Sequence, residues 1–358
     1  MRLRHLLGSI CPCLLGAACL GGPPPVDEDP VPTGRTTFRF EPVEVAGVTP
    51  RWGASVADGH LLGGVDDTMR VTDEVFSLAR GDAGLSGTSV GALDVPRFCG
   101  CALYDEGRRE LVMLGGRDDF YRDETTAVLI DVDTGERTPL EHGGAADHPV
   151  GCMAFFSPSA DRGYVFGGAD QSGFSAATWR WDPEARTFTR LDVDGPPGRY
   201  DAGVVPLADG GALMVSGMGM GGMAMKFYRD VWRFDVASES WREVAPATEE
   251  APPGRRYPWL ALSPDESTLV MGFGSDSPRG ESVLGDLWRL DLASGAWRAL
   301  EVGGEVEGEL PAARGFTFRL PGPIGTAGVL AFGSDAELNL YQDAFALTVP
   351  DDLAGEWR

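Results

Sequence analysis

The amino-acid sequence predicts an all-β fold made of one unit that recurs six times. The clearest copies are segments 230–244 and 286–300, which share the frame Asp-x-Trp-Arg-x-Asp-x-Ala-Ser-x-x-Trp-Arg. Apolar and polar residues alternate at the start of each copy, as in a strand with one buried face. The composition agrees, because Gly 50 and Pro 26 suit many short strands joined by turns.

Each copy contains a β-hairpin. In the first copy a turn separates the strand with Trp232 from the strand with Trp241, and in the second a turn separates Trp288 from Trp297. The two Trp rings of a copy can pack on one face of the sheet. Weaker copies begin at four further points of the chain: Asp73, Ala127, Thr178 and Asp343.

Two signals precede each hairpin. An apolar run ends in a pair of small residues, and an arginine, usually beside an aromatic residue, comes before that run; His148-Pro149 replaces the arginine in the third unit. The small-residue pairs are Gly63-Gly64, Gly115-Gly116, Gly167-Gly168, Ser216-Gly217, Gly272-Phe-Gly274 and Gly333-Ser334.

This order of arginine, two strands, small pair, loop and Trp hairpin resembles the kelch repeat over residues 38–358. The resemblance implies a six-bladed kelch-type β-propeller over residues 36–358, with each blade a four-stranded antiparallel sheet. The alternating segment 36–43 stands where other units have their last strand, so we expect it to pair with the final blade and close the ring. Trp357 is the alternative source of that last strand.

The N-terminus has the pattern of an export signal over residues 1–19. Small residues before Cys19 resemble the bacterial lipobox, which implies lipidation of Cys19, although Gly16 stands where Leu, Val or Ile is usual; ordinary secretion is the alternative. Residues 20–35 are rich in Pro and acidic residues and predict a flexible tether. The expected location is the outer membrane or cell surface as a lipoprotein, otherwise the periplasm or the exterior.

The formal net charge of −24 argues against nucleic acid as a partner, because the chain would repel phosphates. We expect a monomer that touches a membrane only through the N-terminal lipid.

Arginines at the start of the units are candidate ligand-binding residues. They would lie near one mouth of the central channel, where converging guanidiniums could bind a carboxylate or an acidic sugar. Six-bladed kelch proteins that act on sialic acid motivate this hypothesis. The alternative is a framework role, in which each arginine pairs with backbone carbonyls or a neighbouring carboxylate. The candidates are Arg51, Arg97, Arg199, Arg256 (or Arg255) and Arg314.

Methionines crowd the longest loop of the fourth unit. Thioethers without His or Cys are soft ligands that suit Cu(I), and a Gly-rich methionine loop is also a deformable contact surface for a partner. A loop with no dedicated role is the third interpretation. The methionines are Met218, Met220, Met223 and Met225, preceded by Met214.

Cysteines of the third and second units predict a disulfide. If His148 takes the place of Arg97, Cys101 and Cys152 lie at the same point of adjacent inner strands, and an oxidising compartment favours a bond from Cys152 to Cys101 or Cys99. Cys99 and Cys101 are poor partners for each other, because they share one face of one strand. Zinc binding by these residues is conceivable, but Cys-x-Cys is not its usual spacing, and we predict no metal.

The sequence presents no catalytic constellation. Copper-radical oxidases with a kelch fold need two His, two Tyr and a Cys cross-linked to one Tyr. The chain after the export signal has only His60, His142 and His148, and two of these lie six residues apart in one connection, which argues against that enzyme class. We therefore expect a non-catalytic module, without a cofactor, that binds a protein or glycan outside the cytoplasm. The alternatives are a sugar-active enzyme of the sialic acid mutarotase kind, using arginines at the channel mouth, and a Cu(I)-binding surface protein.

Overall fold

The computed structural model describes residues 36–358, except for positions 82–83, 247, 309, 323–325, 356 and 358. The predicted export signal, Cys19 and the tether lie outside the described residues. Residues 35–358 form one compact unit. Within its described part the only helix is the 3-10 helix η1 (Asp351–Leu353), and no helix there is long and apolar enough to cross a membrane.

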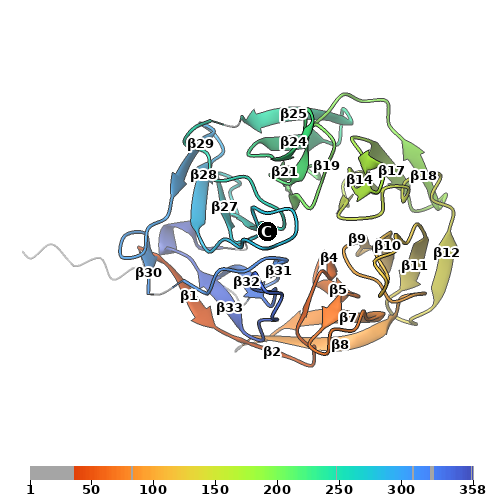
Figure 1. Cartoon of the computed structure of the whole chain (residues 1–358), viewed down its shortest axis with the longest axis horizontal. Coiled ribbons are helices and arrows are strands. Elements are labelled where there is room, and N and C mark those ends of the chain that lie inside the picture. The colour runs from red at the N-terminus through yellow and green to blue at the C-terminus, as the bar shows by residue number, and fades with distance from the viewer. Residues whose placement is uncertain are drawn as a thin grey trace, which may run out of the picture. The chain divides into compact units, whose positions relative to one another are not determined.

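Six sheets of four or five strands surround a central axis, which makes the fold a β-propeller (Figure 1). Each sheet contains the four antiparallel strands that the sequence predicts, and the first and last sheets add a fifth, parallel strand. The innermost strands contact one another in cyclic order, β4, β9, β13, β20, β26, β31 and back to β4.

The strands of blades 1 to 3 follow the predicted repeat. Blade 1 contains β4 (Ser55–Ala57), β5 (His60–Leu62), β7 (Glu74–Arg80) and β8 (Gly84–Ala92), with β2 (Glu44–Ala46) added. Blade 2 contains β9 (Cys101–Asp105), β10 (Glu110–Leu114), β11 (Ala127–Asp131) and β12 (Arg137–Leu140). Blade 3 contains β13 (Met153–Ser157), β14 (Arg162–Phe166), β17 (Thr178–Asp182) and β18 (Thr187–Arg190).

The remaining blades repeat this pattern. Blade 4 contains β20 (Gly203–Pro206), β21 (Ala212–Val215), β24 (Val231–Asp235) and β25 (Ser240–Ala245). Blade 5 contains β26 (Trp259–Leu262), β27 (Thr268–Gly272), β28 (Leu287–Asp291) and β29 (Ala296–Ala299). Blade 6 contains β31 (Phe318–Leu320), β32 (Thr326–Ala331), β33 (Ala344–Thr348) and β1 (Phe38–Pro42), with β30 (Val306–Glu307) added.

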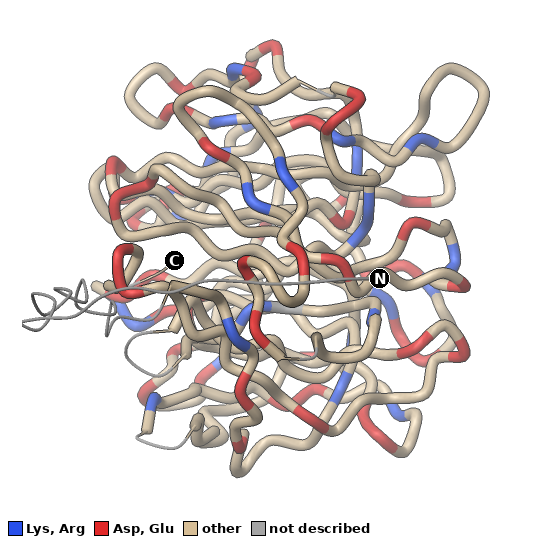
Figure 2. Tube along the Cα trace, turned by 90° about the vertical axis from the view of Figure 1, so that its left-hand side faces the viewer, with Lys and Arg blue, Asp and Glu red and all other residues tan. Residues whose placement is uncertain are grey.

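Small sheets stand outside the blades and consist of segments after the small-residue pairs, two of them paired with the arginine segment that precedes the innermost strand. They are β3 (Arg51–Trp52) with β6 (Val65–Asp66), β15 (Ala169–Asp170) with β16 (Gly173–Phe174), and β19 (Arg199–Tyr200) with β22 (Met218–Gly221) and β23 (Ala224–Phe227). Acidic residues are spread over many loops and turns of the unit on the side seen in Figure 2.

The two ends of the described chain meet in blade 6. Strand β1 pairs antiparallel with β33, which confirms the predicted ring closure. Trp357 lies outside every strand, so it does not supply the last strand of the blade. Its ring packs edge-on against Phe38 of β1, with centroids 6.4 Å apart, and its indole N–H donates to the carbonyl of Leu353.

Framework arginines tie the small-residue pair of a blade to its third strand. In blade 4, Arg199 Nη1 donates to the carbonyl of Ser216, and its two Nη atoms lie 2.6 and 2.9 Å from the carboxylate of Asp230. Asp230 also accepts the indole N–H of Trp232 at 2.8 Å. The aspartate of the frame Asp-x-Trp therefore binds the framework arginine. Arg51, Arg255 and Arg314 make the equivalent bonds to a carbonyl and to an acidic residue at the start of the third strand. Arg97 binds the carbonyl of Gly115 but pairs with Asp94, which precedes it in the chain. All five arginines are fully buried.

Because Arg199 and Asp230 form a buried ion pair, we expect the fold to lose stability in acid. Burial raises the pKa of Asp230, but the hydrogen bonds and charge of Arg199 outweigh burial, and the pKa lies below its ordinary value of 3.8. Because the folded pKa is the lower one, the pair stabilises the fold above the ordinary pKa and less as the pH falls. Asp230→Asn should lower the free energy of unfolding by about 3 kcal/mol at pH 7, a deficit that shrinks below about pH 4.

Urea unfolding at pH 7 and at about pH 3 measures this deficit. Asp133→Asn is the matched control, because Asp133 pairs with Arg109 at an exposed site and should matter little at either pH. An equal deficit for Asp230→Asn at the two pH values would contradict the prediction.

Candidate functional site

Six residues, one shortly before each innermost strand, form a ring around the central axis. In five blades the ring residue stands two positions after the framework arginine, and in blade 3 it stands two positions after Pro149. We call these residues the throat ring. All have positive φ: Gly53 (65°), Cys99 (54°), Gly151 (63°), Asp201 (55°), Tyr257 (50°) and Phe316 (51°).

Backbone hydrogen bonds join the throat ring from blade to blade. The N–H of Cys99 donates to the carbonyl of Gly53 at 2.6 Å, Gly151 to Cys99 at 2.7 Å, and Asp201 to Gly151 at 2.8 Å. Tyr257 N–H donates to Asp201, and the hydroxyl of Thr317 donates to Tyr257, each at 2.8 Å. The repeat thus fixes the backbone of this ring, while the side chains at its six positions differ.

The ring corrects the alignment of the third unit. Gly116 N–H donates to the carbonyl of Pro149 as Gly64 N–H donates to that of Arg97, so Pro149 and not His148 takes the arginine position. His148 instead lies 3.4 Å from Asp170. The pattern Arg-aromatic could not reveal this, because neither residue of His148-Pro149 is an arginine.

The mouth cavity lies on one side of the throat ring and has a volume of about 260 Å³. All six blades contribute to it. Residues one position before the throat ring form part of its wall (Trp52, Phe98, Val150, Tyr200 and Arg256), Cys99, Tyr257 and Phe316 come from the ring, and Arg117, Tyr121, Pro278, Arg279 and Leu338 come from the loops. A second cavity of about 130 Å³ follows the innermost strands and shares the same three ring residues. Those side chains therefore separate the mouth from the channel.

Arg256 is the predicted arginine that reaches the mouth cavity. Its Nε donates to Asp201 at 2.7 Å, and its guanidinium lies over the rings of Tyr200 and Tyr257, 4.7 and 5.1 Å from their centroids. Arg255, its neighbour, has the framework role. The structure does not bring Arg51, Arg97, Arg199 and Arg314 together at the mouth, because each is buried within its own blade, and the expected converging ring is corrected to Arg256 alone.

Burial sets the protonation of the groups at the base of the mouth cavity. It raises the pKa of Asp201, although the charge of Arg256 favours the ionised carboxylate. It also raises the pKa values of Tyr200 and Tyr257, and that of the Cys99 thiol to about 12. The Sγ of Cys99 lies 3.3 Å from the hydroxyl of Tyr257. At neutral pH the phenols and the thiol therefore stay protonated.

Arg117, Tyr121 and Arg279 are site residues that the sequence did not single out. They lie in the loops after the small-residue pairs, where only position in the repeat could have marked them. Arg117 pairs with Asp123 at 2.9 Å. The exposed guanidinium of Arg279 has no partner among the residues that the structure describes.

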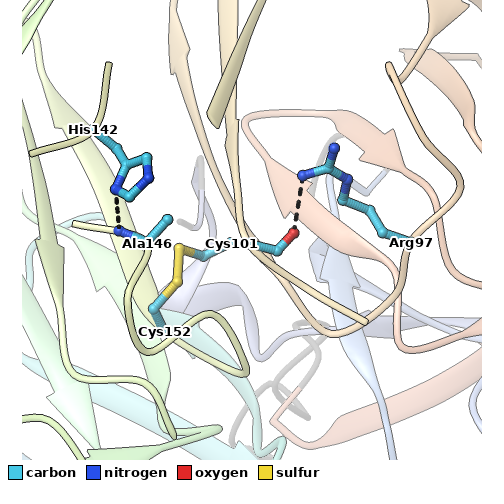
Figure 3. Close-up of a disulfide and its surroundings, with 6 residues drawn as sticks. Arg97, Cys101, His142, Ala146 and Cys152 are labelled. Atoms are coloured by element: carbon cyan, nitrogen blue, oxygen red, sulfur yellow. Dashed lines mark hydrogen bonds between the residues drawn. A yellow bond between two sulfur atoms is a disulfide. The ribbon is translucent and has the colours of Figure 1, made fainter. Parts of the chain in front are cut away.

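A disulfide joins Cys101 of β9 to Cys152, which immediately precedes β13, with Cα atoms 5.5 Å apart. Figure 3 shows this bond between neighbouring blades, close to the loop in which the His142 ring accepts the N–H of Ala146. Cys99 is the free cysteine of the described chain. No three His, Cys, Asp or Glu residues in that part of the chain are placed to hold a metal ion.

The methionine segment is a β-hairpin, β22–β23, rather than the expected loop. Met214 is buried in β21 and Met218 is 1% exposed. Met220 and Met225 are cross-strand partners, 42% and 51% exposed, and Met223 at the turn is fully exposed. The hairpin extends from β19, whose Tyr200 lines the mouth cavity, so it belongs to the same face of the propeller.

Comparison with known proteins supports this architecture. A family model described as the KLHDC2/KLHL20/DRC7 Kelch-repeats domain matches residues 101–318. The chain belongs to the kelch-repeat family. A solved structure titled "Structure of YjhT" is similar to this kelch protein over 87% of this chain and 99% of that chain, with a TM-score of 0.65 and 16% identity, which shows the fold alone. Comparison with curated proteins gives no match.

The position of Cys99 in this kelch propeller predicts a protected thiol. Because the thiol is buried and its pKa is about 12, iodoacetamide at pH 8 should leave Cys99 unmodified in the folded protein and alkylate it fully in urea. Peptide mass mapping without reductant measures this and confirms that Cys101 and Cys152 stay unlabelled. Rapid alkylation of Cys99 in the folded protein would contradict the burial of the throat ring.

Proposed function

We propose that this kelch propeller is an exported, lipid-anchored, non-catalytic module that binds a protein or glycan, and that the mouth cavity is its binding site. The observation that carries the proposal is the composition of the cavity, in which all six blades place side chains around one hollow on the axis. Aromatic side chains dominate the wall and polar atoms lie at its base, as is typical of ligand sites that recognise one inserted group.

The protonation states of the side chains at the floor of the mouth cavity favour ligand binding over acid–base catalysis. Arg256 and Asp201 neutralise each other, and Cys99 and the two tyrosines are held in their protonated forms near neutral pH. A general acid or base works best when its pKa lies near the operating pH. These groups are therefore suited to donating hydrogen bonds to a ligand.

Exposed apolar side chains on the loops around the cavity support a macromolecular partner. Large hydrophobic side chains on a surface often mark a contact site. Seven are strongly exposed in the described chain, and six of them lie on the connections that follow the small-residue pairs: Met69, Phe120, Tyr121, Met220, Met223 and Met225. The seventh is Val302, which lies between β29 and β30.

A sugar-active enzyme of the sialic acid mutarotase kind is the second candidate. The observation in its favour is Arg279, whose guanidinium at the mouth cavity has no partner in the described part of the chain and is suited to bind a sugar carboxylate.

Ligand binding at the mouth cavity is tested by thermal shift of the full mature chain against neutral sugars, N-acetylneuraminic acid and synthetic peptides. For any compound that raises the melting temperature, Tyr121→Ala and Arg279→Ala should each weaken binding about tenfold. Val302→Ala is the control and should leave binding unchanged. Equal binding by all three variants would exclude the cavity, whereas a response confined to the acidic sugar, with faster exchange of its anomers by NMR, would favour the enzyme.

Lipid anchoring through Cys19 is tested separately by detergent partition. The proposal expects the unaltered protein in the detergent phase and the Cys19→Ser variant in the aqueous phase, because the acyl chains supply the membrane affinity. If both proteins partition alike, the proposal of a lipid anchor is wrong, whereas the proposal of the binding site is not affected by this result.

A further inference from the structure

The β22–β23 hairpin sorts its side chains into two chemically different faces. Successive residues of a strand point to opposite faces. Met218 and Met220 have the same parity on β22, and their cross-strand partners on β23 are Phe227 and Met225. The opposite face has Gly219 and Gly221 paired with Lys226 and Ala224. Thioethers thus lie on one face only.

Packing leaves most methionine side chains of the hairpin exposed. Met220, Met223 and Met225 are 42%, 101% and 51% exposed, whereas Met218 at the base of the hairpin is 1% exposed. The other face is held in place, because the hydroxyl of Tyr228 donates to the carbonyl of Met220 at 3.0 Å and the Tyr228 ring lies under Arg199 and Lys226. The hairpin is therefore a supported element that presents thioethers to solvent.

The donor set of this face matches one metal ion in particular. Directly opposite residues of an antiparallel pair have Cβ atoms about 5 Å apart, so the thioethers of Met220 and Met225 can converge on one ion. Thioether sulfur is a soft donor that favours Cu(I) over the cations that prefer oxygen ligands. We propose that the hairpin binds one Cu(I) ion between Met220 and Met225, with Met223 at the turn as a third donor.

This site is independent of the mouth cavity, whose lining includes none of the hairpin methionines. It also differs from the Cys99 thiol, which is buried below the cavity. Glycines beside the ligands, with Gly222 at φ 72°, let the turn close without a steric penalty while Met223 folds over the ion.

The experiment is a competition for Cu(I) between the full mature chain and bicinchoninate, with ascorbate as the reductant because it leaves the disulfide intact. The unaltered protein should remove one equivalent of copper from the chelator. The variant with Met220→Leu and Met225→Leu keeps the apolar volume but loses two donors, and its affinity should fall at least about a hundredfold. X-ray absorption of the loaded protein should show sulfur neighbours only.

Met69→Leu is the matched control, because Met69 is an exposed methionine, 58% accessible, on another loop of the same face. It should bind copper like the unaltered protein. Equal uptake by the hairpin variant would place the copper elsewhere and overturn the proposal, as would no uptake by the unaltered protein. An unchanged melting temperature of the apo hairpin variant shows that a loss of copper is not a loss of fold.

Discussion

The throat ring is the constraint on which the rest of the propeller depends. Six residues hold positive φ, backbone hydrogen bonds link blades 1 to 5 through them, and the Thr317 hydroxyl links blade 6 to Tyr257. Positive φ costs little for glycine but about 1–3 kcal/mol for other residues, yet Cys99, Asp201, Tyr257 and Phe316 all adopt it. The framework arginine just before and the innermost strand just after over-determine this conformation. Side chains at the ring are therefore free to differ in chemistry without changing the backbone that holds them.

Placement of the charged pair at the mouth follows from that ring. Asp201 is a ring residue, and Arg256 stands one position before Tyr257, the ring residue of the next blade. The fold therefore sets the 2.7 Å hydrogen bond from Arg256 Nε to Asp201. Gly151 is required beside them, since a Cβ there would lie 2.0 Å from Asp201 Oδ1. A buried pair of this kind contributes little net stability over an apolar one. The role of this pair at the floor of an aromatic cavity is better understood as supplying oriented hydrogen-bond donors to a ligand.

Features that repeat were predictable from sequence, and features that occur once were not. The strand pairs and the closure by β1 follow from the frame and its spacing. The disulfide candidate rests on aligning His148 with Arg97, and with Pro149 at the arginine position Cys152 stands one residue before the equivalent of Cys101. The roles of Arg255 and Arg256 could not be separated, because both residues satisfy the pattern, and only the geometry shows which one meets Asp286. The cavity residues Arg117, Tyr121 and Arg279 come from loops of unequal length, where no register links one unit to the next. The methionine hairpin shows no strand alternation in the sequence, because its glycines interrupt the pattern.

Blade 3 shows how the propeller tolerates a missing framework arginine. Pro149 stands at that position, so this blade lacks the guanidinium that elsewhere binds a carbonyl and an acidic residue. The Cys101–Cys152 disulfide lies at the start of the same blade and joins residues with a sequence separation of 51. Cross-linking a loop of this length stabilises a fold by about 4 kcal/mol in the chain-entropy model, whereas a complete buried ion pair adds little net stability over well-packed apolar residues. The missing arginine therefore leaves no buried charge unpaired in blade 3, and the disulfide stabilises this blade wherever conditions are oxidising enough for the bond to persist.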